Sequence, residues 1–210
     1  MGKVAELNAP KQAIGVWPEY CTHTQAVGLS IREKKFSLSV RPFSPIAGDS
    51  FNIDDVVAKK ATFKVSGKSM TLHGRKKFID IESGKEIFTL VKRHWRLRTT
   101  FEGITGKEQV KFTITKKFFS LRGTLIATFT NAATKQPETL VLTGSIFDRK
   151  AEIKWNNQTV GRISRKFGNF AEFAMNQQTY ILSVAPNVDK ALLVALCVVL
   201  DETQNEKQRT

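Results

Sequence analysis

The sequence predicts a mainly β fold: a closed antiparallel β-barrel of about 12 strands that encloses a central hydrophobic C-terminal α-helix. Three observations lead to this prediction. Apolar and polar residues alternate over most of the chain, turn residues interrupt the alternation at short intervals, and one uninterrupted apolar run, Ala191 to Leu200, comes last. The 210 residues, 41% of them hydrophobic, are enough to enclose one sizeable core.

Residues 1–35 show little periodicity and contain Pro10, Pro18 and Trp17. We expect an N-terminal arm that docks one aromatic side chain. The start of the chain lacks the apolar core of a secretion signal. Two cysteines, Cys21 and Cys197, cannot build a disulfide framework, and Cys197 is expected to be a buried, inert thiol. These features favour a reducing compartment, and we expect a cytoplasmic protein, peripheral at a membrane or nuclear as alternatives.

The segment 36–202 is expected to form the barrel. Its residues alternate with period two, which places one side-chain face in a core and the other in water. Turn residues such as Ser83-Gly84 and Asn156-Asn157 separate the stretches. Two segments, 78–93 and 151–166, share the order strand, polar turn, strand, basic pair, as expected for hairpins of one antiparallel wall. The expected strands contain Phe36, Leu38 and Val40; Phe63 and Val65; Met70 and Leu72; Phe78 to Ile81; Ile87 to Val91; Trp95 and Leu97; Val110, Phe112 and Ile114; Leu125 to Phe129; Leu140 to Phe147; Glu152 to Trp155; Val160 to Ser164; Ala171 to Met175; and Tyr180 to Val184.

The apolar run predicts a helix over residues 188–201, with Asn187 as its N-cap and a polar tail over 203–210. Apolar residues occupy every side of this helix, so other elements must surround it. A lumen of about 12 strands is too wide for wall side chains alone to fill, whereas a helix fits it. Asp201 and Glu202 oppose the helix dipole and therefore need basic partners at the barrel rim. The run has ten residues, too few for a transmembrane span.

The segment from Tyr180 to Glu202 resembles the closing signature of the LURP-one-related family, part of the tubby-like superfamily. Residues 78–103, with Ser83-Gly84, Lys92-Arg93, Trp95 and Phe101-Glu102-Gly103, resemble the central block of that family, and 153–166 its penultimate hairpin. The similarity spans about 36–202. One departure is Asn187, where the family usually has Gly; Asn tolerates the same turn geometry.

This resemblance implies a twelve-stranded barrel around a central hydrophobic helix. Tubby domains in the superfamily bind phosphoinositides, other relatives are phospholipid scramblases, and plant members of the nearer family are linked to pathogen defence. No established reaction comes with the resemblance. The lipid-contacting residues of tubby domains find no matching motif in this chain, so none is carried over.

Catalysis finds little support in the sequence, and we expect neither an enzyme nor a cofactor. The three histidines, His23, His73 and His94, lie far apart and outside any metal-binding spacing, so surface or structural roles are expected. Asp80 and Glu82 share one face of a strand, and beside Lys76, Lys77 and Lys85 we interpret them as solvated charge pairs. The nucleophile elbow and the phosphate-binding P-loop are both absent from the sequence.

The chain is strongly basic, with a formal charge of +14, and the excess is concentrated. Residues 59–122 hold 17 Lys and Arg against five acids, a net charge of +12. With Trp95, Leu97 and Phe101 facing inward on one strand and Val110, Phe112 and Ile114 on the next, the alternation points several bases outward. The candidate anion- or lipid-binding residues are Arg96, Arg98, Lys111 and Lys117.

We therefore expect a non-enzymatic intracellular binding module whose basic flank meets anionic phospholipid or phosphoinositide. A solubilising surface explains the same charge. A protein-interaction adaptor in defence or stress signalling is an alternative that rests on the family resemblance. Nucleic acid is a less favoured partner, because no RRM, KH, zinc-finger or homeodomain signature is present. Phe118 and Phe119 are adjacent, so one of them is a candidate exposed anchor.

Overall fold

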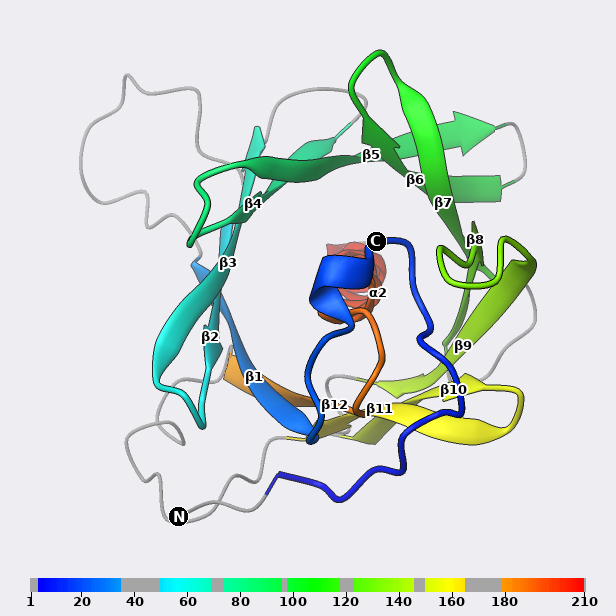
Figure 1. Ribbon diagram of the computed structural model, residues 1–210. Helices are drawn as coiled ribbons and strands as arrows, with labels where there is room; N and C mark the ends of the chain where they lie inside the picture. The colour runs from blue at the N-terminus through cyan, green and yellow to red at the C-terminus, as the bar shows by residue number, and fades with distance from the viewer. Residues whose placement is uncertain are drawn as a thin grey trace.

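The computed structural model describes residues 4–34, 50–68, 74–95, 98–117, 123–145, 150–164 and 179–209. Within these ranges the chain forms twelve strands, a short 3-10 helix and a long α-helix (Figure 1). The elements are η1 Pro18–Tyr20, β1 Val27–Lys34, β2 Ser50–Asp55, β3 Lys60–Lys68, β4 Arg75–Asp80, β5 Glu86–Trp95, β6 Arg98–Thr105, β7 Gln109–Lys116, β8 Thr124–Thr130, β9 Pro137–Ser145, β10 Lys150–Trp155, β11 Gln158–Ser164, β12 Thr179–Val184 and α2 Lys190–Arg209.

The strands form a closed antiparallel barrel. Each strand pairs with its neighbours in sequence, and β1 closes the ring by pairing with β12, Leu29 lying opposite Leu182. The mainly β, closed-barrel prediction is confirmed. The two similar hairpins of the sequence are β4–β5 and β10–β11, and in each the register shifts by one residue near the turn.

The barrel has two different ends. The hairpin turns that follow β2, β4, β6, β8 and β10 lie at the end where α2 begins, and we name it the strap end after the N-terminal segment that covers it. We name the opposite end the tail end. Helix α2 runs toward it, because Glu202 in the second half of α2 contacts Lys76, the second residue of β4, which starts at that end.

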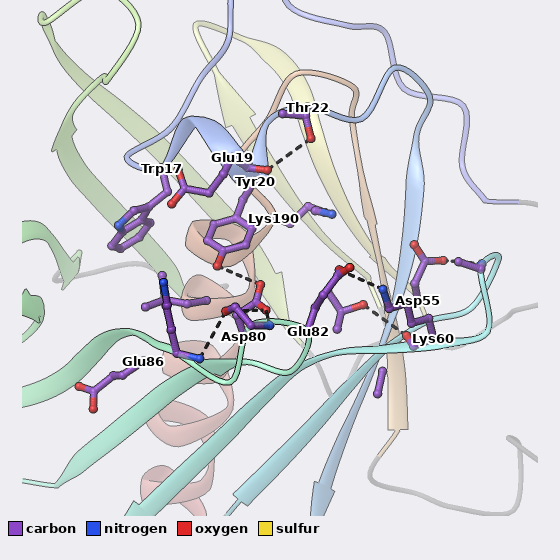
Figure 2. A pocket seen from close by; sticks show the side chains of 16 residues that line it. Trp17, Glu19, Tyr20, Thr22, Asp55, Lys60, Asp80, Glu82, Glu86 and Lys190 are labelled. Carbon is purple, nitrogen blue, oxygen red and sulfur yellow. Dashed lines mark hydrogen bonds and ion pairs between the residues drawn. The ribbon is translucent and has the colours of Figure 1, made fainter.

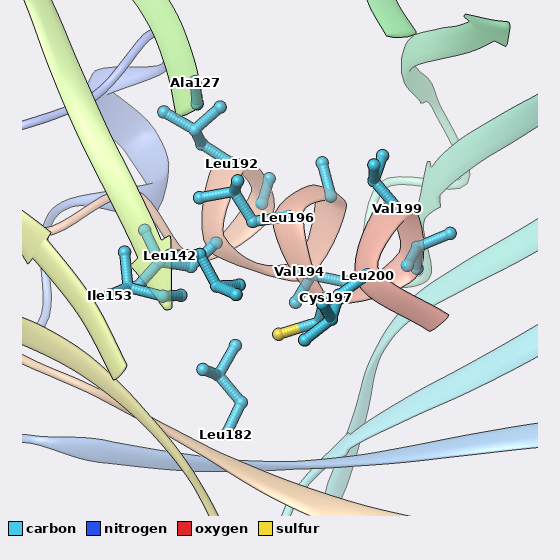
Figure 3. Packing of buried hydrophobic residues seen from close by; sticks show 14 of the residues in the cluster. Ala127, Leu142, Ile153, Leu182, Leu192, Val194, Leu196, Cys197, Val199 and Leu200 are labelled. Atoms are coloured by element: carbon cyan, nitrogen blue, oxygen red, sulfur yellow. The ribbon is translucent and has the colours of Figure 1, made fainter. Parts of the chain in front are cut away.

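The apolar run is buried on every side, as predicted. Every residue from Ala191 to Leu200 is at most 1% exposed. In Figure 3, Leu192 and Leu196 of α2 point toward strands β8 and β9, on which Ala127 and Leu142 are labelled. Figure 1 shows α2 end-on inside the ring of strands. At Gly161 of β11 a Cβ atom would lie 2.9 Å from Leu193 Cδ2, so glycine lets the wall approach the helix closely.

Helix α2 differs from its prediction at both ends. It begins at Lys190, and its N-cap is Asp189, whose Oδ1 accepts the N–H groups of Ala191 (2.9 Å) and Leu192 (3.1 Å). Asn187 instead takes a left-handed turn with φ 61°, a conformation that Gly and Asn tolerate best. The predicted polar tail is helical to Arg209, because the residues after Leu200 are mostly good helix formers.

The barrel begins earlier than residue 36, because β1 lies within the segment expected to be an arm. Alternation does not identify this strand, because the residues on both of its faces are buried; these are Gly28, Leu29, Ser30 and Ile31. The inward placement of Val110 is wrong: it is 48% exposed, beside the β6–β7 turn where the register shifts. The predicted strands around Phe36, Met70 and Ala171 lie outside the described residues.

Candidate functional site

The segment Ala13–His23, here named the strap, crosses the strap end of the barrel. Ile14 forms a parallel bridge with Val188: its N–H donates to Asn187 O and its carbonyl accepts from Asp189 N–H, both at 2.9 Å. On the other side, Asn131 of the β8–β9 turn donates from Nδ2 to Ala13 O at 3.0 Å. The strap therefore connects the loop before α2 to the opposite wall of the barrel.

Trp17 anchors the strap by aromatic packing. Its ring stacks on Phe88 of β5, with centroids 4.8 Å apart and planes 13° apart, and meets Phe112 of β7 edge-on at 6.0 Å. Phe88 and Phe112 are at most 1% exposed, so Trp17 extends the barrel core at this end. This confirms the prediction that the N-terminal segment docks one aromatic side chain.

Asp189 joins the strap to α2. While Oδ1 caps the helix, Oδ2 accepts the N–H groups of Val16 and Trp17, each at 3.0 Å. The carboxyl group is fully buried, so four backbone N–H groups depend on one side chain. Gly15 is required beside it, because a Cβ atom there would lie 2.2 Å from Asp189 Cβ. Asp189 falls within the predicted helix 188–201, and no local pattern in the sequence predicts its contact with the strap.

Burial raises the pKa of Asp189 from 3.8 to about 6, although the backbone N–H groups of Trp17, Leu192, Val16 and Ala191 act in the opposite direction. The folded state therefore binds this proton more tightly than the unfolded state does. The resulting stabilisation is fully present below pH 3.8 and is lost as pH rises through about 6.

We predict that the stability advantage of wild type over Asp189→Asn shrinks by about 2 kcal/mol between pH 4 and pH 7. Urea unfolding of both proteins across this range measures it. His23 titrates in the opposite sense, because burial lowers its pKa, but its contribution cancels in the difference between the two proteins. A difference that is constant with pH would contradict the prediction.

A pocket of about 640 Å³ lies beside the strap (Figure 2). The strap supplies Trp17 and Tyr20 to it, the strap-end parts of the β2–β3 and β4–β5 hairpins supply most of the remaining wall, and Lys190 comes from the first turn of α2. Tyr20 packs edge-on against Phe63, at 5.3 Å between ring centroids, and donates from its hydroxyl to Asp80 Oδ2 at 3.0 Å.

The pocket has more carboxylates than ammonium groups, and most of these carboxylates already have partners. Glu82 pairs with Lys60 at 2.9 Å, and Glu86 with Lys77 at 2.9 Å. Burial alone would raise the pKa of Asp80, but hydrogen bonds from Ser83 and Tyr20 lower it. Asp80 therefore holds the β4–β5 turn to the strap as a carboxylate. The carboxylates that line the pocket are Glu19, Asp55, Asp80, Glu82 and Glu86, and the lysines are Lys60, Lys85 and Lys190.

The prediction that Asp80 and Glu82 pair with Lys76, Lys77 and Lys85 is wrong, because both acids have other partners. Asp80 bonds Tyr20 and Ser83, and Glu82 bonds Lys60 across the neighbouring strands. Lys76 turns inward, away from both. Ser83 is local to Asp80, but Tyr20 of the strap and Lys60 of β3 are distant in sequence from the acids that they contact.

The described residues contain no group of three or more His, Cys, Asp or Glu arranged to hold a metal ion. Both cysteines are buried thiols, and burial raises the pKa of Cys21 to about 12 and that of Cys197 further, so neither is an activated nucleophile. His23 binds the Ala185 carbonyl through Nε2 at 2.8 Å, the structural role expected of it, and His94 is exposed. His73 lies outside the described residues.

The four candidate anion-binding residues are only partly brought together. Lys117 follows β7 and is exposed, and Arg98 is the first residue of β6, so both lie at the tail end. Thr100 pairs with Thr115, and continuing that register by two residues brings Arg98 opposite Lys117. Lys111 lies six residues from Lys117 along the chain, roughly 20 Å away. Arg96, and the predicted anchors Phe118 and Phe119, lie outside the described residues.

On the outer flank of β4 to β7, within the segment 59–122 of net charge +12, two arginines are already paired with acids. Arg93 bonds Glu102 at 3.1 Å and Glu108 at 3.5 Å, and Glu108 also accepts from Arg75 at 2.6 Å. These hydrogen bonds lower the pKa of the Glu108 carboxyl group. Two arginines and two glutamates thus neutralise each other on this face.

The charged residues that begin or end the strands differ between the two ends of the barrel. At the tail end, six of the twelve strands begin or end with Lys or Arg and none with an acid; at the strap end, the terminal residues include one base and three acids. The tail-end bases are Lys34, Lys68, Arg75, Arg98, Lys116 and Lys150, and the charged strap-end residues are Asp55, Lys60, Asp80 and Glu86. These strand-terminal charges complement the dipole of α2, whose positive N-terminus lies at the strap end and whose negative C-terminus lies toward the tail end.

Lys76 is the basic rim partner that the sequence analysis required for Glu202. Its Nζ atom lies 2.9 Å from Glu202 Oε1, and the Lys76 side chain is only 8% exposed. Sequence reasoning grouped Lys76 with exposed lysines. Its alternation with the buried Phe78 was the available signal that it faces inward.

Comparison with known proteins identifies one family. A family model described as LURP-one-related matches residues 27–201, from the first residue of β1 to α2. No curated protein matches the chain. In the part of the chain that the structure describes, no helix has both the length and the apolar character needed to cross a membrane.

Proposed function

Because the chain belongs to the LURP-one-related family, we propose that it is a non-enzymatic binding module of that type, whose basic tail end and adjoining flank attach to anionic phospholipid. In this proposal α2 occupies the centre of the barrel and makes the wall a rigid platform. The candidate contacts are Arg98 and Lys117 at the tail end, Lys111 on the flank of β7, and Arg96, which lies outside the described residues.

One observation carries the proposal: the six strand-terminal bases at the tail end, with no strand-terminal acid among them. Such a one-sided arrangement attracts a negatively charged surface and orients the molecule toward it. The same bases also complement the C-terminus of α2, so a purely structural or solubilising role is the competing explanation. Binding to lipid separates the two.

Flotation with vesicles that contain anionic lipid tests the proposal. Each Lys or Arg near such a surface contributes about 1 kcal/mol, so changing Arg96, Arg98, Lys111 and Lys117 together to Glu should weaken binding by about a thousandfold. The matched control changes Lys11, Lys59, Lys107 and Lys135 to Glu; these are exposed, and the last three lie in turns of the strap end. It alters the net charge equally and should retain most of the binding.

Three results would contradict the proposal: no salt-sensitive flotation of wild type, an equal loss in both variants, or no loss in either. Equal loss would mean that only net charge acts. Gel shifts with RNA and DNA provide the comparison with nucleic acid, for which affinity should fall steeply with salt.

A further inference from the structure

The pocket beside the strap, here named the strap pocket, takes no part in the function proposed above, because the described lipid-contact candidates lie at the tail end and on the flank of β7. Its volume of about 640 Å³ falls within the range of small-molecule sites, about 300 to 1,000 Å³. Its walls come from parts of the chain that are far apart in sequence: the strap, the strap-end parts of the β2–β3 and β4–β5 hairpins, and the start of α2. The fold therefore assembles a concave surface of ligand size at this end.

Most of the carboxylates that line the strap pocket are already engaged. Ion pairs hold Glu82 and Glu86, and Asp80 accepts the hydroxyl of Tyr20. Asp55 Oδ1 accepts two N–H groups of the β2–β3 turn, at 2.8 Å and 2.9 Å. The strap pocket therefore has no large unpaired charge with which to select an anion or a cation.

Three charged groups of the wall have no hydrogen bond or ion pair in the part of the chain that the structure describes. They are the carboxylate of Glu19 and the ammonium groups of Lys85 and Lys190. A carboxylate only accepts hydrogen bonds, and an ammonium group only donates them. An anionic ligand would suit the lysines and be repelled by Glu19, and a cationic ligand would do the reverse. A hydroxyl group both donates and accepts, so a ligand with several hydroxyls can bond to all three.

Two aromatic rings give the strap pocket an apolar wall. Trp17 and Tyr20 line it and are half-buried, so part of each side chain is open to the pocket. Packing against Phe88, at 4.8 Å between ring centroids, and against Phe63, at 5.3 Å, holds the two rings in place. Figure 2 shows the Tyr20 ring extending toward Asp80. Such a wall packs against the C–H groups of a ligand while the polar groups around it bond to the rest.

We propose that the strap pocket binds an uncharged carbohydrate. A sugar ring carries the two features that this wall suits: hydroxyl groups that donate and accept, and C–H groups that pack on an aromatic ring. The strap supplies Trp17, Glu19 and Tyr20, so the complete site exists only while the strap is docked. Sugar binding does not depend on lipid binding. The four-residue Glu variant of the flotation experiment should bind sugar as wild type does, so the two proposals fail separately.

A glycan array of neutral, acidic and amino sugars, followed by calorimetry with the free sugars, tests the proposal. The calorimetry uses neutral disaccharides such as maltose, cellobiose and lactose, together with any neutral sugar that the array identifies. At least one neutral sugar should bind, with an affinity that changes less than about twofold between about 50 mM and 300 mM salt, because salt screens only interactions between charges. No binding of a neutral sugar, or binding that salt abolishes, would overturn the proposal.

Two variants with opposite changes in charge test whether the sugar lies in the strap pocket. Glu19→Met and Lys85→Met each remove one unpaired hydrogen-bonding group, and both should weaken binding of that sugar about threefold to tenfold. Net charge alone cannot weaken binding in both, because it changes in opposite directions. The matched control is Lys59→Met, at an exposed lysine of the β2–β3 turn that does not line the pocket, and it should leave the affinity unchanged. Unchanged affinity in either pocket variant, or an equal loss in the control, would overturn the proposal.

Hydrogen exchange with and without the sugar tests the dependence on the strap. At a sugar concentration about ten times its Kd, protection of the Val16 and Trp17 amides should rise about tenfold, because the strap then opens only after the ligand leaves. The amides of the β10–β11 turn, which lies outside the pocket, are the control and should not change. Unchanged exchange at Val16 and Trp17, or an equal change in the β10–β11 turn, would place the ligand elsewhere and overturn the proposal.

Discussion

Changing Leu196 to Asp should prevent the chain from folding in soluble form. Leu196 is fully buried in the middle of α2, and the residues on both sides of it in the apolar run are buried as well. A carboxylate there has no described charged partner, so it must remain unpaired or take up a proton. The penalty for burying an ion is several kcal/mol, and the lost packing of a core leucine adds about 2 to 5 kcal/mol. Together they approach the total stability of a domain, about 5 to 15 kcal/mol.

Soluble yield and thermal unfolding followed by circular dichroism measure this effect. The control is Val57→Asp, a similar apolar-to-acid change. Val57 lies in a turn and is 60% exposed. It should fold with a nearly unchanged melting temperature. A soluble Leu196→Asp protein that melts at the wild-type temperature would show that the run is not the core of the barrel.

The elements with strong periodicity were predictable from sequence. Residues such as Phe112 and Ile114 alternate cleanly, and the all-round apolar run from Ala191 to Leu200 required burial on every side. That requirement was enough to indicate a closed wall of strands. It also predicted that Glu202 needs a basic partner, which the structure supplies as Lys76.

Elements whose residues are buried on both faces, or whose partners are distant in sequence, were not predictable. In strand β1, Gly28 and Ser30 lie on the outer face, where alternation leads one to expect exposed polar residues. Both are buried. The strap depends on Asp189, more than 170 residues from Val16 and Trp17. No local pattern states such a pairing, because it exists only after the barrel closes.

Asp189 is the residue at which the strap can be separated from the helix. Asp189→Ala should cost about 3 to 5 kcal/mol in the free energy of unfolding, because it removes the N-cap and leaves four N–H groups, two of them buried and two half-buried, without this acceptor. Asp189→Asn should cost less. Asn still accepts from Ala191 and Leu192 through Oδ1, since it is a good N-cap, but its amide group now faces the N–H groups of Val16 and Trp17.

Hydrogen exchange at single amides distinguishes the two effects. In Asp189→Asn, protection should fall at Val16 and Trp17 and persist at Ala191 and Leu192, whereas in Asp189→Ala it should fall at all four. Protection of Val16 and Trp17 that survives in the Asn variant would mean that the strap is held without the carboxylate, by Trp17 packing on Phe88 and the backbone bonds of Ile14. The pattern in the Asn variant therefore decides whether the carboxylate is needed to fasten the N-terminal segment across the barrel.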